Sequence, residues 1–426
     1  MKKTEQLTIE VCAHWQGIAQ PTLVGRLYAA PARGKEIFSF EYDASWMKSR
    51  YAQSLDPSLQ LYQGRQYAPE GQKNFGAFLD SSPDTWGRLL MRRREAQAAR
   101  EEKRPERNLW ESEYLLGVYD GHRPGGLRFR TSPEGPFLDN NTHMASPPWT
   151  SLRDLEYASL QLESDDAEKN REYSQWLRVL LVPGGSLGGT RPKASVLDER
   201  GCLWIAKFPS RTDEFDVGAW EHVTIKLAER ARVETTVADS RKFTARHHTF
   251  LTKRFDRTVA GERSHFASAM TLLQHVDGDN ASTGASYLEL AKFITQGGAR
   301  PDADLEQLWR RIVFFVCVSN TDDHLRNHGF LLQPTGWVLS PAYDVNPSPH
   351  SADGLKLNIS ETDNAQNLDL VRSVAQHFRV KPPRTDEIIA EVVAAVKGWR
   401  KEASALHIPS SEQDRMERAF RVAERA

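Results

Sequence analysis

The chain has 426 residues, which is long enough for two or three domains of ordinary size. Apolar residues make up 39% and charged residues 27%, values close to those of folded soluble proteins, so the composition argues against a disordered or membrane-spanning chain. The 56 basic residues nearly balance the 57 acidic ones, which argues against a chain-wide field that attracts nucleic acid or an anionic membrane.

The three cysteines, Cys12, Cys202 and Cys317, are scattered and lack the spacing of a zinc site or a disulfide framework. The first residues, MKKTEQ, place polar side chains where a secretory signal needs an apolar stretch. We therefore expect reduced thiols and a cytoplasmic protein without a membrane partner.

Residues 1–150 mix predicted strands with predicted helix. Short segments rich in β-branched and apolar residues predict strands at 7–12 and 23–29, and the stretch 86–100 is typical of a helix. Pro, Gly, Asn and Ser accumulate at 132–148, where they favour turns. The sequence thus predicts a small mixed α/β subdomain that ends in a linker.

The next segment, 151–255, begins with a polar helical stretch and continues through a glycine cluster into predicted strands at 194–197 and 203–208. This pattern predicts a lobe that contains a sheet.

From residue 256 to residue 426 the pattern becomes mainly helical. Apolar residues recur at helical spacing in 287–294, 305–318 and 387–399. We expect a helical lobe here.

The most informative segment is 320–327, NTDDHLRN, which lies between the apolar runs 312–318 and 329–332. Phosphoryl transfer needs a carboxylate near the acceptor hydroxyl and an oxygen ligand on magnesium, and kinase catalytic loops supply these as Asp and Asn five residues apart. Asp322 and Asn327 have this spacing.

A second carboxylate, Asp344, follows Asn327 by 17 residues after a predicted hairpin, where it could bind the metal that bridges the phosphates. The alternative is that these Asp and Asn residues only form turns. Several acids and an amide between apolar segments are costly to bury without partners or a metal, so we favour the site.

A glycine-rich segment at 183–193, PGGSLGGTRPK, precedes the predicted strand at 203–208. Glycines permit the close backbone approach that an anion requires. Lys207 ends the strand and could contact phosphates, and Glu221, in the helical pattern 219–228, could hold it as an ion pair. The alternatives are a flexible hairpin, a solvated lysine and an ordinary helix glutamate.

Together these segments resemble HipA, the kinase toxin of bacterial toxin–antitoxin pairs. The resemblance is carried by SLGGTRPKA, IAKFP, LTKRFDR, NTDDHLRNH and LSPAYDVNP, and upstream by VGRLY, SWMKSRYAQSL, PDTWGRLLMRR and GVYDGHRPGGLRFR, so it covers nearly the whole chain. It implies an α+β, protein-kinase-like two-lobed fold, with an N-terminal subdomain at 1–150, a kinase N-lobe at 151–255 and a helical C-lobe at 256–426.

The resemblance also implies roles for single residues. Asp322 would be the catalytic base, and Asn327 and Asp344 would bind Mg²⁺. The residues implied to bind ATP are Gly188, Gly189, Thr190, Arg191, Pro192, Lys193, Lys207, Lys253, Arg254, Phe255, His324, Leu325, Arg326, Asn327, Tyr343, Asp344, Val345 and Asn346. Ser186 falls where the family carries an inhibitory autophosphorylated serine, and a doubly charged group there would disturb the nucleotide loop.

The implied activity is an ATP- and magnesium-dependent serine/threonine-protein kinase of the kind associated with persistence. Its acceptor would be a translation protein, such as an aminoacyl-tRNA synthetase. Its partner would be a HipB-like DNA-binding antitoxin, and the near-neutral charge leaves DNA contact to that partner. The alternatives are a small-molecule phosphotransferase and a non-catalytic nucleotide-binding regulator that acts with a DNA-binding partner.

Some residues depart from familiar patterns. Asp323 stands where the family often has Gly, and Lys253 stands where an acid is frequent, which leaves the adenine hinge contact to backbone groups. His324 either orients Asp322 or packs in the protein. The adjacent His247 and His248 are not expected to share a metal, because neighbours on a strand point to opposite faces.

Overall fold

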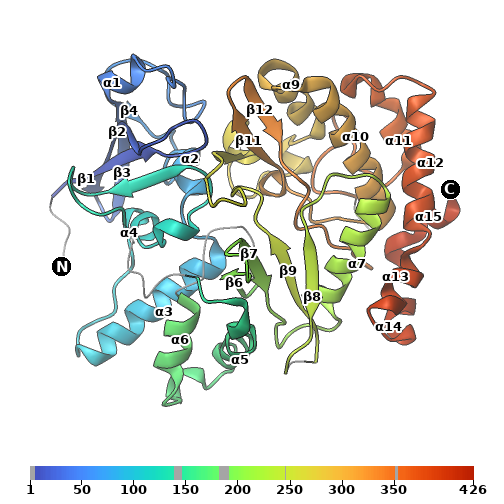
Figure 1. Cartoon of the computed structure of the whole chain (residues 1–426), viewed down its shortest axis with the longest axis horizontal. Helices are drawn as coiled ribbons and strands as arrows, with labels where there is room; N and C mark the ends of the chain where they lie inside the picture. Colours follow the sequence, from blue (N-terminus) through green and yellow to red (C-terminus); the bar gives the residue numbers. More distant parts are fainter. Residues whose placement is uncertain (1–4, 139–145, 182–190, 245, 351–353) are drawn as a thin grey trace. The chain divides into compact units, whose positions relative to one another are not determined.

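The computed structural model describes residues 5–138, 146–181, 191–244, 246–350 and 354–426. Two compact units make up the chain (Figure 1). Unit 1 comprises Met1–Ser210 and Asp256–Ala267, and unit 2 comprises Arg211–Phe255 and Ser268–Ala426. The predicted segment 151–255 is thus divided between the units, and the three-part domain division remains a prediction.

Unit 1 begins with an antiparallel sheet. Its strands are β1 (Leu7–Ala13), β2 (Thr22–Ala32), β3 (Lys35–Tyr42), β4 (Gln66–Tyr67) and β5 (Leu127–Arg130), in the spatial order β4-β3-β2-β1-β5. Ile9 lies opposite Leu27, and Val11 lies opposite Phe129. All four of these side chains are fully buried, so one face of the sheet forms core. The strands predicted at 7–12 and 23–29 are confirmed.

The helices of unit 1 are α1 (Ala44–Met47), α2 (Gly76–Asp80), α3 (Thr85–Glu101), α4 (Glu111–Leu116), α5 (Leu152–Leu162) and α6 (Tyr173–Leu181). The helix predicted at 86–100 is α3. Asp84 caps its N-terminus, because the Asp84 carboxylate accepts a hydrogen bond of 2.7 Å from the backbone N–H of Gly87. Trp86 and Leu90 bury one side of α3, and α3 contacts α6.

A hairpin completes the regular structure of unit 1. It pairs β6 (Lys193–Leu197) with β7 (Leu203–Lys207) in antiparallel register, with Lys193 opposite Lys207 and Ala194 opposite Ala206. Both strands lie where the sequence predicts them. A short strand, β10 (Phe266–Ser268), spans the division between the two units.

Unit 2 is mainly helical. Its helices are α7 (Val217–Arg230), α8 (Ala269–Leu272), α9 (Tyr287–Gly297), α10 (Pro301–Val318), α11 (Leu368–Ser373), α12 (Arg384–Val396), α13 (Trp399–Ala405), α14 (Ser410–Met416) and α15 (Arg421–Arg425). Its described strands are β8 (Ala238–Arg241) and β9 (Thr249–Lys253), which pair with each other, and β11 (Gly329–Gln333) and β12 (Gly336–Leu339), which form a second antiparallel hairpin.

Helix α10 is the core element of unit 2. Proline at its first position and Asp302 and Asp304 in its first turn favour a helix start. Every residue from 308 to 318 is buried, and α10 contacts α9, α11 and α12 (Figure 1). The helix ends at Ser319, whose φ of 50° turns the chain into the next loop. The core therefore fixes the point at which that loop begins.

An aromatic cluster joins α7 to the C-terminal helices within unit 2. The rings of Trp399 and Phe420 stack at 4.5 Å, and the Trp220 ring lies 6.0 Å from that of Trp399. The Glu412 carboxylate accepts a hydrogen bond of 2.8 Å from the Trp220 indole. No helix among the described residues combines the length and hydropathy that a membrane span requires.

Candidate active site

The predicted catalytic loop connects α10 to β11. Asp322 is exposed, whereas Asp323, the next residue, is buried with 1% of its surface exposed. The Asn327 side chain donates a hydrogen bond of 3.2 Å to the Asp322 carbonyl, and the Asn327 N–H donates one of 2.8 Å to the carbonyl of His324. These two hydrogen bonds close the loop and hold the Asn327 side chain beside the backbone of Asp322.

Beneath this loop, Asp323 forms two buried contacts. Its Oδ2 atom accepts a hydrogen bond of 2.6 Å from the Tyr287 hydroxyl and lies 2.7 Å from Nε2 of His328. Burial and the nearby Asp323 carboxylate hold the pKa of Tyr287 well above its usual range, so Tyr287 remains a protonated donor.

The segment Tyr343–Asn346, predicted to carry the metal-binding carboxylate, lies against the catalytic loop. The Tyr343 hydroxyl donates a hydrogen bond of 2.6 Å to the Arg326 carbonyl. The Asn346 N–H donates one of 3.0 Å to Oδ1 of Asn320, at the start of the loop. Unit 2 therefore brings the segments of Asn327 and Asp344 together, although they lie on opposite sides of the β11–β12 hairpin.

Asp344 adopts a strained backbone conformation. Its φ of 55° lies in the left-handed region that non-glycine residues rarely occupy, at a cost of about 1 kcal/mol. Asn346 Nδ2 donates a hydrogen bond of 3.2 Å to Asp344 Oδ1 and thereby orients its carboxylate. Such outliers gather at functional sites.

The donor chemistry of this region fits a magnesium ion. The side chains of Asn327 and Asp344 offer hard oxygen ligands, and Asn346 Oδ1 is a buried acceptor without a hydrogen-bond partner. Mg²⁺ in nucleotide enzymes is bound by one or two carboxylates together with phosphate oxygens and water. The described residues contain no cluster of three or more His, Cys, Asp or Glu side chains that could hold a metal ion.

The predicted adenine hinge follows β9. Phe255 and Tyr343 have ring centroids 5.4 Å apart, so the hinge segment contacts the metal-binding segment within unit 2. The Lys253 N–H donates a hydrogen bond of 2.8 Å to the Val237 carbonyl, and the Lys253 carbonyl accepts one of 2.5 Å from the Thr236 hydroxyl. The backbone groups of Lys253 are thus already used within the protein.

The remaining predicted residues of unit 2 are Arg254, Leu325 and Val345, which are buried in the protein, and Glu221, which is buried on α7.

Unit 1 holds the predicted phosphate lysines. Lys193 is buried, and its Nζ atom forms an ion pair of 2.9 Å with Asp84 Oδ2. The indole of Trp86 donates a hydrogen bond of 3.1 Å to the Lys193 carbonyl. Lys207 is half-buried at the end of β7, and Arg191 and Pro192 precede β6. Gly188, Gly189, Thr190 and Ser186 lie outside the described residues.

One prediction about the histidines was wrong. His247 lies in a bend and His248 directly precedes β9, so their predicted place on a strand was wrong. His248 Nδ1 instead lies 2.6 Å from Asp216 Oδ2. His324 Nδ1 is buried without a hydrogen-bond partner, and the histidine that contacts an acid beneath the loop is His328.

Four residues of this region were missed by the sequence-based prediction: Asn320, Tyr287, Asp323 and His328. Asp323 and His328 are five residues apart, the same spacing as Asp322 and Asn327, and this repetition was a readable signal. Tyr287, on α9, carried none, because only the tertiary fold brings it to the loop.

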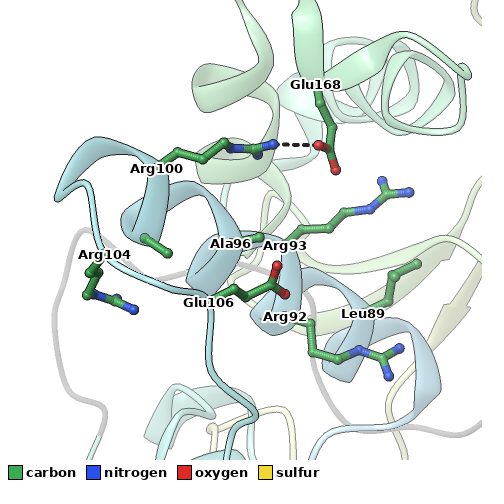
Figure 2. Close-up of a pocket in the computed structure, with 9 residues that line it drawn as sticks. Leu89, Arg92, Arg93, Ala96, Arg100, Arg104, Glu106 and Glu168 are labelled. Atoms are coloured by element: carbon green, nitrogen blue, oxygen red, sulfur yellow. Dashed lines mark hydrogen bonds and ion pairs between the residues drawn. The ribbon is translucent and has the colours of Figure 1, made fainter. Parts of the chain in front are cut away.

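A separate cavity of about 430 Å³ lies on α3 in unit 1 (Figure 2). Its lining residues are Leu89, Arg92, Arg93, Ala96, Ala99, Arg100, Arg104, Glu106 and Glu168. Figure 2 shows Arg100 facing Glu168, with which it forms an ion pair, and Arg104 pairs with Glu95 and Glu102. These ion pairs neutralise part of the positive charge of the arginines that line the cavity. None of the lining residues belongs to the predicted kinase site.

Known proteins share features with this chain. The family description "HipA-like C-terminal domain" matches residues 185–399, a little over half of the chain. A chain from the Shewanella oneidensis MR-1 toxin–antitoxin complex of HipA, HipB and operator DNA is similar, with a TM-score of 0.64 and 15% identity over 98% of this chain and 97% of that one. The Helicobacter pylori proinflammatory kinase CtkA gives a TM-score of 0.37 and 13% identity over 54% of this chain and 92% of that one. No curated protein matches.

The Shewanella match confirms the predicted α+β, kinase-like fold of the HipA type. This protein therefore has a kinase-like fold with its acidic loop between α10 and β11. The chain belongs to the HipA-like family, because the family match spans more than half of it.

Proposed function

We propose that this protein is an ATP-dependent serine/threonine-protein kinase that acts as the toxin of a HipBA-like toxin–antitoxin pair. One observation carries the kinase proposal: two hydrogen bonds, from Tyr343 to Arg326 and from Asn346 to Asn320, join the predicted metal-binding segment to the loop of Asp322. Phosphoryl transfer depends mainly on positioning and electrostatics, and these bonds support a site in which the proposed base and the proposed oxygen ligands act together.

In the proposed reaction Asp322 accepts or orients the proton of the acceptor hydroxyl, because its exposed carboxylate is open to a second protein. Asn327 and Asp344 would hold Mg²⁺, which when bound neutralises charge on the phosphates. Asn346 orients the Asp344 carboxylate for that task. Lys207 is proposed to contact the phosphates of ATP.

The biological assignment rests on the family. The Shewanella HipA structure is a complex with HipB and operator DNA, which supports a HipB-like antitoxin as the partner here and DNA contact through that partner. The proposed acceptor is a serine or threonine of a translation protein, such as an aminoacyl-tRNA synthetase, in the cytoplasm. Autophosphorylation at Ser186 is proposed to inhibit the enzyme.

The test is incorporation of label from γ-labelled ATP with Mg²⁺ into protein. Wild type should transfer label, and Asp322→Ala should lose it roughly a hundredfold or more, since a general base contributes at least that factor. Asp386→Ala is the matched control, because Asp386 is exposed on α12 and its ion pair with Arg372 lies on the surface. Equal label in wild type and Asp322→Ala would refute the mechanism.

Two further readouts separate the finer proposals. Label on a metabolite with none on protein would favour a small-molecule phosphotransferase. Mass spectrometry after incubation with ATP should find phosphate on Ser186, and its persistent absence would contradict the proposed autoinhibition.

A further inference from the structure

A buried contact between Asp323 and His328 lies beneath the loop that carries Asp322 and Asn327. Asp323 directly follows Asp322, and His328 directly follows Asn327, so the contact of 2.7 Å between Asp323 and His328 spans the same five-residue interval. Asp322 is exposed, whereas Asp323 and His328 each expose only 1% of their surface. The Asp323–His328 contact therefore spans the loop one residue after Asp322 and Asn327.

The buried Asp323 carboxylate has the hydrogen-bond partners that such a group needs. A charge removed from water requires hydrogen bonds, and the Asp323 Oδ2 atom receives one from the Tyr287 hydroxyl at 2.6 Å and faces His328 Nε2. His328 Nδ1 is buried without a partner, which favours the tautomer with its proton on Nε2, donated to Asp323. Both contacts of Asp323 are therefore donors, and its position is well defined.

Tyr287 connects this pair to a rigid element. It is the first residue of α9 and is fully buried. The helix start is held by a capping box, in which Ser286 and Glu289 each accept a hydrogen bond from the other's backbone N–H. Tyr287 cannot shift without disturbing this cap. Its hydrogen bond to Asp323 therefore holds the loop at a fixed position relative to α9.

We propose that Asp323, His328 and Tyr287 are positioning residues that fix the separation and direction of Asp322 and Asn327. This inference rests on the proposed kinase function. The buried contacts of Asp323 with Tyr287 and His328 hold the inner side of the loop in place. The Asn327 side chain donates a hydrogen bond to the Asp322 carbonyl and so ties these two residues together. A displacement of about 1 Å at such a site can lower the rate roughly a hundredfold.

The test uses two conservative variants. Asp323→Asn keeps the size of the side chain but removes its charge and one acceptor oxygen, and Tyr287→Phe keeps the ring but removes the hydroxyl donor. Both should lower kcat by roughly tenfold to a hundredfold, while KM for ATP changes less than threefold. The Mg²⁺ concentration for half-maximal rate should rise, because Asn327 moves with the loop.

Tyr42→Phe is the matched control. The Tyr42 hydroxyl is also buried and donates a hydrogen bond to the Leu59 carbonyl, but Tyr42 belongs to the sheet of unit 1. It should reduce thermal stability about as much as Tyr287→Phe without changing kcat. A fall in kcat of equal size in both Tyr→Phe variants, or in neither, would overturn the proposal.

A second measurement separates this inference from the kinase function itself. Hydrogen–deuterium exchange of the amides in 322–328 reports loop order without requiring turnover. Exchange there should accelerate at least tenfold in Asp323→Asn and Tyr287→Phe while exchange in α10 stays unchanged. If wild type transfers no phosphate, the kinase proposal fails, and unchanged exchange in the variants would independently overturn the positioning role.

Discussion

The buried ion pair between Lys193 and Asp84 offers a sharp test of the structure of unit 1. The Lys193 ammonium and the Asp84 carboxylate are 2.9 Å apart, and their side chains expose only 4% and 3% of their surface. Removing one charge takes away the buried ion-pair partner of the other, which typically costs about 3–5 kcal/mol. Lys193→Met should therefore lower the free energy of unfolding by this amount.

The Asp84 side of the pair can be changed without losing the helix cap. Asn is as good an N-cap residue as Asp, so Asp84→Asn should still accept the Gly87 N–H while it loses the charge pairing with Lys193. The double variant Asp84→Asn, Lys193→Met removes both charges and should be more stable than either single variant, with a coupling of about 2 kcal/mol or more.

Urea unfolding followed by tryptophan fluorescence measures these differences. Arg100→Met is the control, because the Arg100–Glu168 pair in the same unit is about half-exposed and should contribute less than about 1 kcal/mol. A cost for Lys193→Met no greater than for Arg100→Met, or strictly additive costs in the double variant, would show that the pair is not buried as described.

Three further predictions address other parts of the fold. Gly218→Ala should lower the thermal unfolding temperature even though Ala is the better helix former, because the added Cβ would lie 2.2 Å from the His248 carbonyl oxygen; a higher temperature would contradict this. Burial lowers the pKa of His265, which stacks on Trp15, to about 4, below its unfolded value of 6.5. The stability that neutral His265 contributes is then fully present above pH 6.5 and falls by about 3 kcal/mol as the pH drops to 4, and His265→Phe should remove this part of the pH dependence measured by urea unfolding. Burial raises the pKa of the Cys317 thiol to about 12, so iodoacetamide at pH 8.5 should label it only after unfolding, as mass spectrometry would show.

The regular elements could be predicted well because their patterns are local. The apolar and β-branched residues of β1 and β2 and the helical spacing of apolar residues in α10 are local features of the chain. The predicted roles of Asp322 and Asn327 depend on their spacing along the chain, and one loop contains both residues. Such features survive folding unchanged.

Contacts between distant residues could not be predicted in the same way. Lys193 follows the glycine segment and looks available for a phosphate, but its partner Asp84 lies 109 residues away. The spacing of Asp323 and His328 was a readable signal, but the contact of Asp323 with Tyr287 on α9 depends on the tertiary fold. Pairings of this kind depend on the packing of whole elements.

The matched register of the catalytic loop limits how its length can change. Asp322 is exposed, whereas Asn327 is buried, and Asp323 and His328 contact each other in the protein. An insertion or deletion of one residue between them would shift one member of each pair and expose a side chain that needs burial or bury one that needs solvent. A change in the length of this loop would therefore disturb both pairs at once, whereas a substitution alters a single side chain.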